Sequence, residues 1–322
     1  MNASVRNTAI LVAALAALCI GALFLKRSDV YLLNLTMVYL MATFGLNLTV
    51  GYAGQMSLGQ AAFFGIGAYI GAILVKMGFS FLLVVPIAAI ACFVLGLALG
   101  FPALRVQHHY LAFATLGFNV LVFLVMRNEE KVTGGTFGIS NIPRPSVLGM
   151  STDGHIAFFY FTLASLVVLG ALLWYLLRSP WGRAFAALRD NPIRAESLGV
   201  NITAYTLLAF AIGAACAGIG GVYYASLVEF IEPGPFHFST SLMMLLAVIV
   251  GGSGRFFGPV VGTIIIILLP EALRASNVEW LKFMQKWYLV FFGVAVVLLM
   301  VWLPGGILSI ADRWKKAPGE TK

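Results

Sequence analysis

Residues 179–225 of the chain read SPWGRAFAALRDNPIRAESLGVNITAYTLLAFAIGAACAGIGGVYYA. The first half of this stretch is amphipathic, because charged side chains recur among alanines and leucines; they are Arg183, Arg189, Asp190, Arg194 and Glu196. The second half is an apolar run long enough to cross a bilayer. A soluble-looking helix between apolar segments must lie in the aqueous phase. We therefore expect a membrane protein that presents this segment to a partner.

The composition supports a membrane protein. Of the 322 residues, 61% are hydrophobic and only 10% are charged, against about 25% charged residues in soluble domains. The 34 glycines fit close packing between helices in lipid. The formal net charge of +8 is read as a positive-inside bias, and no nucleic-acid partner is expected. Each cysteine lies in an apolar run as a small buried side chain; they are Cys19, Cys92 and Cys216.

The hydrophobic runs predict an all-α polytopic protein with a single transmembrane domain over residues 1–322. A helical span needs about 20 mostly apolar residues. About ten runs qualify, at residues 8–25, 30–50, 61–75, 79–101, 110–126, 156–177, 203–227, 239–252, 260–273 and 287–303. Three of them (61–75, 239–252 and 260–273) are short and interrupted by glycine, which is typical of broken or re-entrant helices near a transport path.

The distribution of Lys and Arg predicts the orientation. The loop at 179–201 and the tail at 304–322 are basic, so both are expected to be cytoplasmic. An even number of spans then places both the N-terminus and the C-terminus in the cytoplasm. The same count places the loop at 127–154, with its acidic residues, outside. The run at 8–25 is interpreted as a retained first helix and not as a cleaved signal peptide.

Residues 51–60, GYAGQMSLGQ, contain glycines and polar side chains between two apolar runs. Such residues at membrane depth are costly unless they are packed or face a cavity. We expect a broken segment at or near a solute path, with Gln55, Ser57 and Gln60 lining or bordering it. The alternative is a simple turn between two spans.

Two further glycine clusters each allow more than one interpretation. Residues 133–139, TGGTFGI, form either a docking loop for an external protein or a glycine-rich turn. Residues 251–259, GGSGRFFGP, have a placement similar to that of residues 51–60, which hints at two related halves. The second cluster also fits the G-x-S-G pattern of an intramembrane serine protease. Ser253 would then need a nearby base, for which His237 is a candidate.

The segment at 183–199 is predicted to form a short helix that Pro192 breaks or restarts. Its expected apolar contact face comprises Ala184, Ala187, Leu188, Ala195 and Leu198. Such a face with a charged rim fits a groove on another protein or, alternatively, the membrane surface. The chain contains no phosphate-binding loop, no HExxH and no dinucleotide fingerprint, so it should bind no cofactor or metal and should not hydrolyse ATP.

Several motifs in order resemble the bacterial branched-chain amino acid ABC transporter permeases, and the M-type subunit in particular. They are GYAGQMSLGQAAFFGIGAY, TGGTFGI, GRAFAALRDNPIRAESLGVN, AFAIGAACAGIGGVYYA and GGSGRFFGPVVG. The resemblance implies that 183–199 is a cytoplasmic coupling helix that transmits the closure of an ATPase to the spans. The expected coupling residues are Arg183, Ala187, Arg189, Asp190, Arg194, Glu196 and Gly199.

The resemblance also implies the partners and the location. A second, H-type permease, two ATP-binding subunits that use ATP and Mg²⁺, and a periplasmic solute-binding protein would assemble with this chain in the bacterial inner membrane. The family also transports urea, short amides and other acids, and these residues do not separate the substrates. Two alternatives remain: a stand-alone secondary transporter or channel, and the serine protease. Few ionisable residues lie within the expected spans, which disfavours ion-driven transport.

Overall fold

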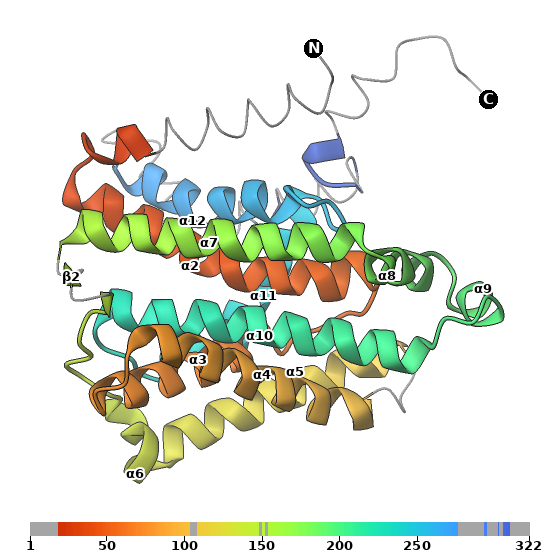
Figure 1. The fold of residues 1–322 in the computed structure, drawn as a ribbon, viewed down its shortest axis with the longest axis horizontal. Coiled ribbons are helices and arrows are strands. Elements are labelled where there is room, and N and C mark those ends of the chain that lie inside the picture. Colours follow the sequence, from red (N-terminus) through yellow and green to blue (C-terminus); the bar gives the residue numbers. More distant parts are fainter. Residues whose placement is uncertain are drawn as a thin grey trace.

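The computed structural model describes residues 19–103, 108–147, 150–151, 154–275, 293–294, 302 and 305–309. Within these residues the protein is a bundle of helices, with one pair of two-residue strands, Ser146–Val147 (β1) and Met150–Ser151 (β2) (Figure 1). Five described helical segments are long and apolar enough to cross a membrane, and three shorter apolar helices accompany them. The predicted all-α membrane fold is confirmed.

The predicted spans between residues 30 and 273 each correspond to one helix. The main helices are α2 (Arg27–Leu46) with its π-helical continuation η1 (Asn47–Tyr52), α3 (Gln60–Lys76), α4 (Phe81–Ala103), α5 (His108–Asn128), α7 (His155–Arg178), α10 (Ile202–Val228), α11 (Phe238–Gly251) and α12 (Gly258–Ala275). The short elements are α6 (Glu130–Thr133), η2 (Gly135–Phe137), α8 (Pro180–Asp190), α9 (Pro192–Ser197) and η3 (Gly234–Phe236). The predicted spans at 8–25 and 287–303 lie mostly outside the described residues.

Helix α10 lies at the centre of the bundle and packs against α2, α3 and α4. Its glycines bring backbones into direct contact. A Cβ on Gly221 would lie 2.0 Å from Phe64 O of α3, and one on Gly218 would lie 2.5 Å from Cys92 Sγ of α4. Close approach of this kind is how small residues hold membrane helices together, because van der Waals contact replaces the hydrophobic driving force that lipid does not supply.

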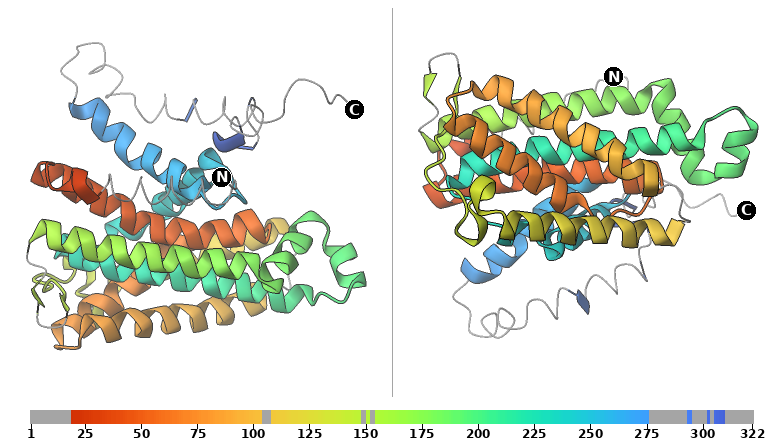
Figure 2. Two further views of the ribbon diagram at one scale, coloured as in Figure 1. Left: turned by 45° about the horizontal axis from the view of Figure 1, so that its top comes forward. Right: turned by 90° about the horizontal axis from the view of Figure 1, so that it is seen from below.

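The bundle has two distinct ends (Figure 1). Helices α8 and α9 extend beyond the long helices at one end, here called the α8 end, and Figure 2 shows the same projection from two other sides. The opposite end, the α6 end, carries α6, η2 and the strand pair. There Arg144 forms a 2.5 Å ion pair with Glu229, and Ile139 pairs with Ile231, so this loop is tied to the segment that follows α10.

Candidate functional site

The α8–α9 unit is two helices separated by a single capping residue. Ser179 Oγ accepts a hydrogen bond from Trp181 N at the start of α8, and Pro180 occupies the first turn. Asn191 ends α8 in an extended conformation and starts α9, because its Oδ1 accepts from Arg194 N at 3.0 Å. Pro192 fits the first turn of α9, where its missing N–H costs no hydrogen bond. The predicted break at Pro192 is confirmed.

The apolar face predicted for partner contact is partly wrong. Ala184, Leu188 and Ala195 are buried against the bundle of this same chain. They accompany Phe185, which is fully buried, with its ring 5.9 Å from that of Tyr205. The helix therefore uses its apolar stripe to dock on its own spans, which periodicity alone does not reveal.

Leu198 of the predicted face and Ile193, which was not part of it, face outward from α9 and its end. Ile193 is 77% exposed and Leu198 is 83% exposed. Four of the predicted coupling residues (Arg183, Asp190, Arg194 and Glu196) are exposed charged side chains of the same unit, and Ala187 is half-buried. Gly199 is exposed and adopts φ +85, a left-handed conformation that suits glycine. The unit thus presents an apolar tip within a charged rim.

Arg189 is also exposed, and its guanidinium contacts the first glycine cluster. Its Nη1 donates a hydrogen bond to Gly51 O at 2.6 Å. A Cβ placed on Gly54 would lie 3.4 Å from Arg189 Cα, so the backbone of the broken segment passes close to α8. One side chain therefore joins the α8–α9 unit to the end of η1.

Asn47 joins the two glycine clusters that the sequence placed in separate halves. Its Nδ2 donates to Arg255 O at 2.9 Å, and its Oδ1 accepts from Gly254 N at 3.0 Å. A Cβ on Gly51 would lie 2.2 Å from Asn47 Oδ1 and 2.3 Å from Gly254 N, so only glycine fits there. We call these residues (Asn47, Gly51, Arg189, Gly254 and Arg255) the glycine junction.

The chain beyond α12 returns to this junction. Arg255 Nη1 donates to Gly305 O, and Ile307 N donates to Val250 O at 2.9 Å. The residues at 305–309 therefore lie against the end of α11. Four regions that are distant in sequence meet at the α8 end: η1, α8, the loop after α11, and residues 305–309.

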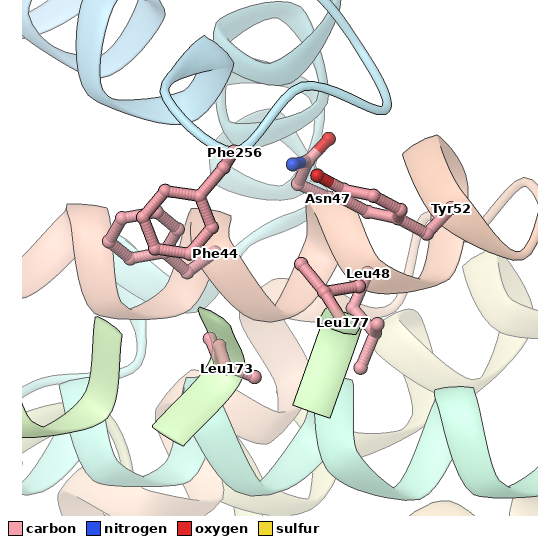
Figure 3. Close-up of a pocket in the computed structure, with 7 residues that line it drawn as sticks. All are labelled: Phe44, Asn47, Leu48, Tyr52, Leu173, Leu177 and Phe256. Carbon is pink, nitrogen blue, oxygen red and sulfur yellow. The ribbon is translucent and has the colours of Figure 1, made fainter. Parts of the chain in front are cut away.

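A small apolar pocket lies beside the junction (Figure 3). Figure 3 shows its lining residues, which come from α2, η1, α7 and the loop after α11: Phe44, Asn47, Leu48, Tyr52, Leu173, Leu177 and Phe256. The Phe44 and Phe256 rings have centroids 5.3 Å apart, and Trp174 meets Phe256 edge-on at 4.8 Å. This aromatic packing fixes the loop after α11 against α2 and α7.

The expected path residues are all buried, and their polar groups contact backbone. The chain is not helical between Ala53 and Gly59, so the predicted broken segment is present. Gln60 Nε2 donates to Ala42 O at 2.8 Å and to Gly213 O at 3.1 Å, which cross-links α3 to α2 and α10. Gln55 Nε2 donates to Ala53 O at 3.3 Å, and Ser57 Oγ accepts from Gly59 N at 3.4 Å. Their contact with solute stays a prediction.

The described interior holds uncharged polar groups. Apart from tyrosines and cysteines, every buried polar side chain in the described part of the chain is Asn, Gln, Ser or Thr. The described residues contain no group of three or more His, Cys, Asp or Glu that could hold a metal ion.

Ser253 lies at the α8 end of α11 and His237 at its other end. A 14-residue helix is about 21 Å long, so this histidine is not within reach of the serine.

Comparison of the sequence with known proteins shows the family of the chain. Residues 28–300 match the model of a family described as the branched-chain amino acid transport system / permease component. The chain belongs to this family. No solved structure is significantly similar to it.

Alignments with curated relatives cover most of the length of this permease chain. It is 33% identical to the high-affinity branched-chain amino acid transport system permease protein LivM of Salmonella typhimurium, over 92% of this chain and 74% of the relative. The LivM protein of Escherichia coli K12 is also 33% identical, over 96% of this chain. The autoinducer 2 import system permease protein LsrC of Escherichia coli is 24% identical, over 90% of this chain and 84% of the relative.

Proposed function

We propose that this chain is the non-catalytic permease subunit of an ATP-driven importer of branched-chain amino acids. It forms half of the translocation path in a bacterial inner membrane, and separate subunits hydrolyse ATP. The observation that carries the proposal is the hydrogen bond from Arg189 to Gly51 O. It connects the protruding α8–α9 unit directly to η1, and the transmission of an external movement requires such a connection.

The α8–α9 unit is the docking element for the ATP-binding subunits. Its exposed Ile193 and Leu198 form an apolar tip within charged residues, and a helix of this kind fits a groove on a partner. The basic residues of the unit favour a cytoplasmic location of the α8 end. The α6 end then faces the periplasm, where a solute-binding protein delivers the solute. A second, H-type permease completes the path.

The uncharged polar groups of the described interior favour one energy source over another. An ion-driven carrier commonly holds titratable side chains at membrane depth, and the buried polar side chains described above carry no charge. This favours an importer powered by partner ATPases, which bind ATP and Mg²⁺, over a stand-alone secondary transporter. The chain itself binds no cofactor in this proposal.

The choice of solute rests on the relatives. The LivM proteins of Salmonella typhimurium and Escherichia coli K12, named for branched-chain amino acid transport, are each 33% identical to this chain. LsrC of Escherichia coli, which is named for autoinducer 2 import, is 24% identical to it. Leucine, isoleucine and valine are therefore the proposed solutes. Urea, short amides and other acids are the competing solute classes.

The experiment is affinity purification of the chain from its native membrane in a mild detergent, followed by mass spectrometry. We expect to recover a second permease and two ATP-binding subunits with it. Recovery of the chain alone, monodisperse and in high yield, would contradict the importer assembly and favour a self-sufficient carrier.

A further inference from the structure

Asn119 of α5 is a fully buried carboxamide without a partner. Its side chain is 0% exposed, and neither Nδ2 nor Oδ1 forms a hydrogen bond within the described structure. By contrast, the amides of Asn47 and Gln60 donate to backbone carbonyls. An unsatisfied buried polar group costs about 1–3 kcal/mol, so two such atoms on one side chain require an explanation.

Asn119 lies at mid-depth in the bundle. Helix α5 begins at His108 near the α8 end and finishes at Asn128 near the α6 end, which places Asn119 close to its middle. The helix is one of the described segments able to cross a membrane. Solute sites of transporters lie near the bilayer midplane, often beside discontinuous helices.

The buried face of α5 directs Asn119 toward the start of α3. One turn earlier, Thr115 Oγ1 accepts a hydrogen bond from Leu58 N at 2.9 Å. Further along, Met126 Cε lies 2.9 Å from the position of a Cβ on Gly65. Thr115, Asn119 and Met126 are buried at helical spacing on one face. Asn119 therefore faces α3 between Leu58 and Gly65, at its first turns.

Two short helices begin at this place and run in opposite directions. Ala61 N in the first turn of α3 donates to Ser241 Oγ in the first turn of α11, at 2.8 Å. Helix α3 continues to the α6 end, where Lys76 Nζ donates to Ser140 O, and α11 continues to the glycine junction. The N-cap of α3, Gly59, supplies no side-chain cap. The positive ends of two helix dipoles thus meet at mid-depth beside an unpaired amide.

We propose that Asn119 and the N-terminal turns of α3 and α11 form the solute subsite, which binds the α-carboxylate and α-ammonium groups of an amino acid. Helix N-termini favour an anion. The Asn119 Nδ2 group donates to the carboxylate, and its Oδ1 accepts from the ammonium group. The subsite is closed in this structure, and it opens when α5 moves away from α3. This inference rests on the proposed importer function.

The test is uptake of radiolabelled leucine, isoleucine and valine by the complete transporter in proteoliposomes. The variant is Asn119→Leu, which removes the amide with little change in volume. The matched control is Thr206→Val in α10, because Thr206 Oγ1 is also buried and unpaired but lies near the α8 end of its helix. Thermal unfolding of both purified variants is measured in parallel.

We expect Asn119→Leu to unfold at the wild-type temperature or above it, since an unsatisfied polar group is removed. Uptake should nevertheless fall at least about tenfold, because the variant loses both hydrogen bonds to charged groups of the solute. Thr206→Val should retain uptake. If the wild-type complex takes up these amino acids and Asn119→Leu takes them up equally well, the inferred subsite is wrong and the proposed function stands. A wild-type complex that transports none of the three amino acids would instead overturn the proposed function, and with it this subsite.

Discussion

Arg189 Nη1 and Gly51 O are joined by a 2.6 Å hydrogen bond between α8 and the last turn of η1. The guanidinium thus contacts a carbonyl in the π-helical stretch that continues α2. Short π-helical stretches occur frequently at functional sites. This hydrogen bond connects the α8–α9 unit directly to η1, and the two hydrogen bonds of Asn47 connect η1 to the loop after α11.

The first prediction concerns Arg189→Ala. Loss of a charged donor to a carbonyl weakens the junction by about 1.5–3 kcal/mol, so we expect leucine uptake per ATP hydrolysed to fall about tenfold. ATPase activity and uptake are measured in the same proteoliposomes. Lys76→Ala is the control, because Lys76 Nζ donates to a backbone carbonyl at the opposite end. Equal losses of coupling in both variants would contradict the role of Arg189.

The second prediction concerns Gly51→Ala. A Cβ at this position would lie 2.2 Å from Asn47 Oδ1, and overpacking of this kind costs about 1–3 kcal/mol. We expect a lower unfolding temperature in detergent. The control is Gly170→Ala in α7, where the nearest atom, Phe256 Cζ, is at 3.8 Å. A Gly51→Ala protein as stable as the control would show that the junction is not packed as described.

The third prediction compares two buried asparagines of α2 and η1. Asn47→Ala leaves Gly254 N and Arg255 O without their partner, so we expect a loss of about 1–3 kcal/mol. Asn34→Leu should be nearly neutral, because Asn34 Nδ2 donates only to Val30 O of its own helix and its Oδ1 is unpaired in the described structure. Thermal unfolding of the two purified variants measures the difference in stability. An Asn34→Leu protein less stable than the Asn47→Ala protein would contradict the prediction.

The fourth prediction concerns the apolar tip of the α8–α9 unit. Leu198→Glu places a charge on a side chain that is 83% exposed, so the permease should fold normally but lose its ATP-binding subunits on purification. The control is Val132→Glu, at a position 59% exposed at the α6 end. Retention of the ATP-binding subunits by Leu198→Glu at the wild-type ratio would rule out this surface as their docking site.

Much of the fold was predictable because the bilayer imposes long apolar helices. The runs between residues 30 and 273 gave the correct order of helices, and Pro192 marked the break between α8 and α9. The broken segment after η1 was also predictable, since glycines and polar side chains interrupt an apolar run there. These features depend on local sequence, which periodicity and composition report directly.

The contacts between distant segments were not predictable. Periodicity identified an apolar stripe on α8, yet Ala184 and Leu188 pack against this chain instead of a partner. The Arg189–Gly51 hydrogen bond and the two hydrogen bonds of Asn47 join residues far apart in sequence. A buried Asn at the end of an apolar run was the available signal for Asn47, because such a group must find partners. Its partners required the three-dimensional arrangement.

The most direct test of the account is the energy source of uptake by the reconstituted transporter, in proteoliposomes that contain this chain with its permease partner and ATP-binding subunits. With the solute-binding protein added outside, we expect leucine uptake that requires ATP on the side of the α8–α9 unit and continues after ionophores collapse all ion gradients. Uptake by this chain alone, driven by an ion gradient and independent of ATP, would contradict the account.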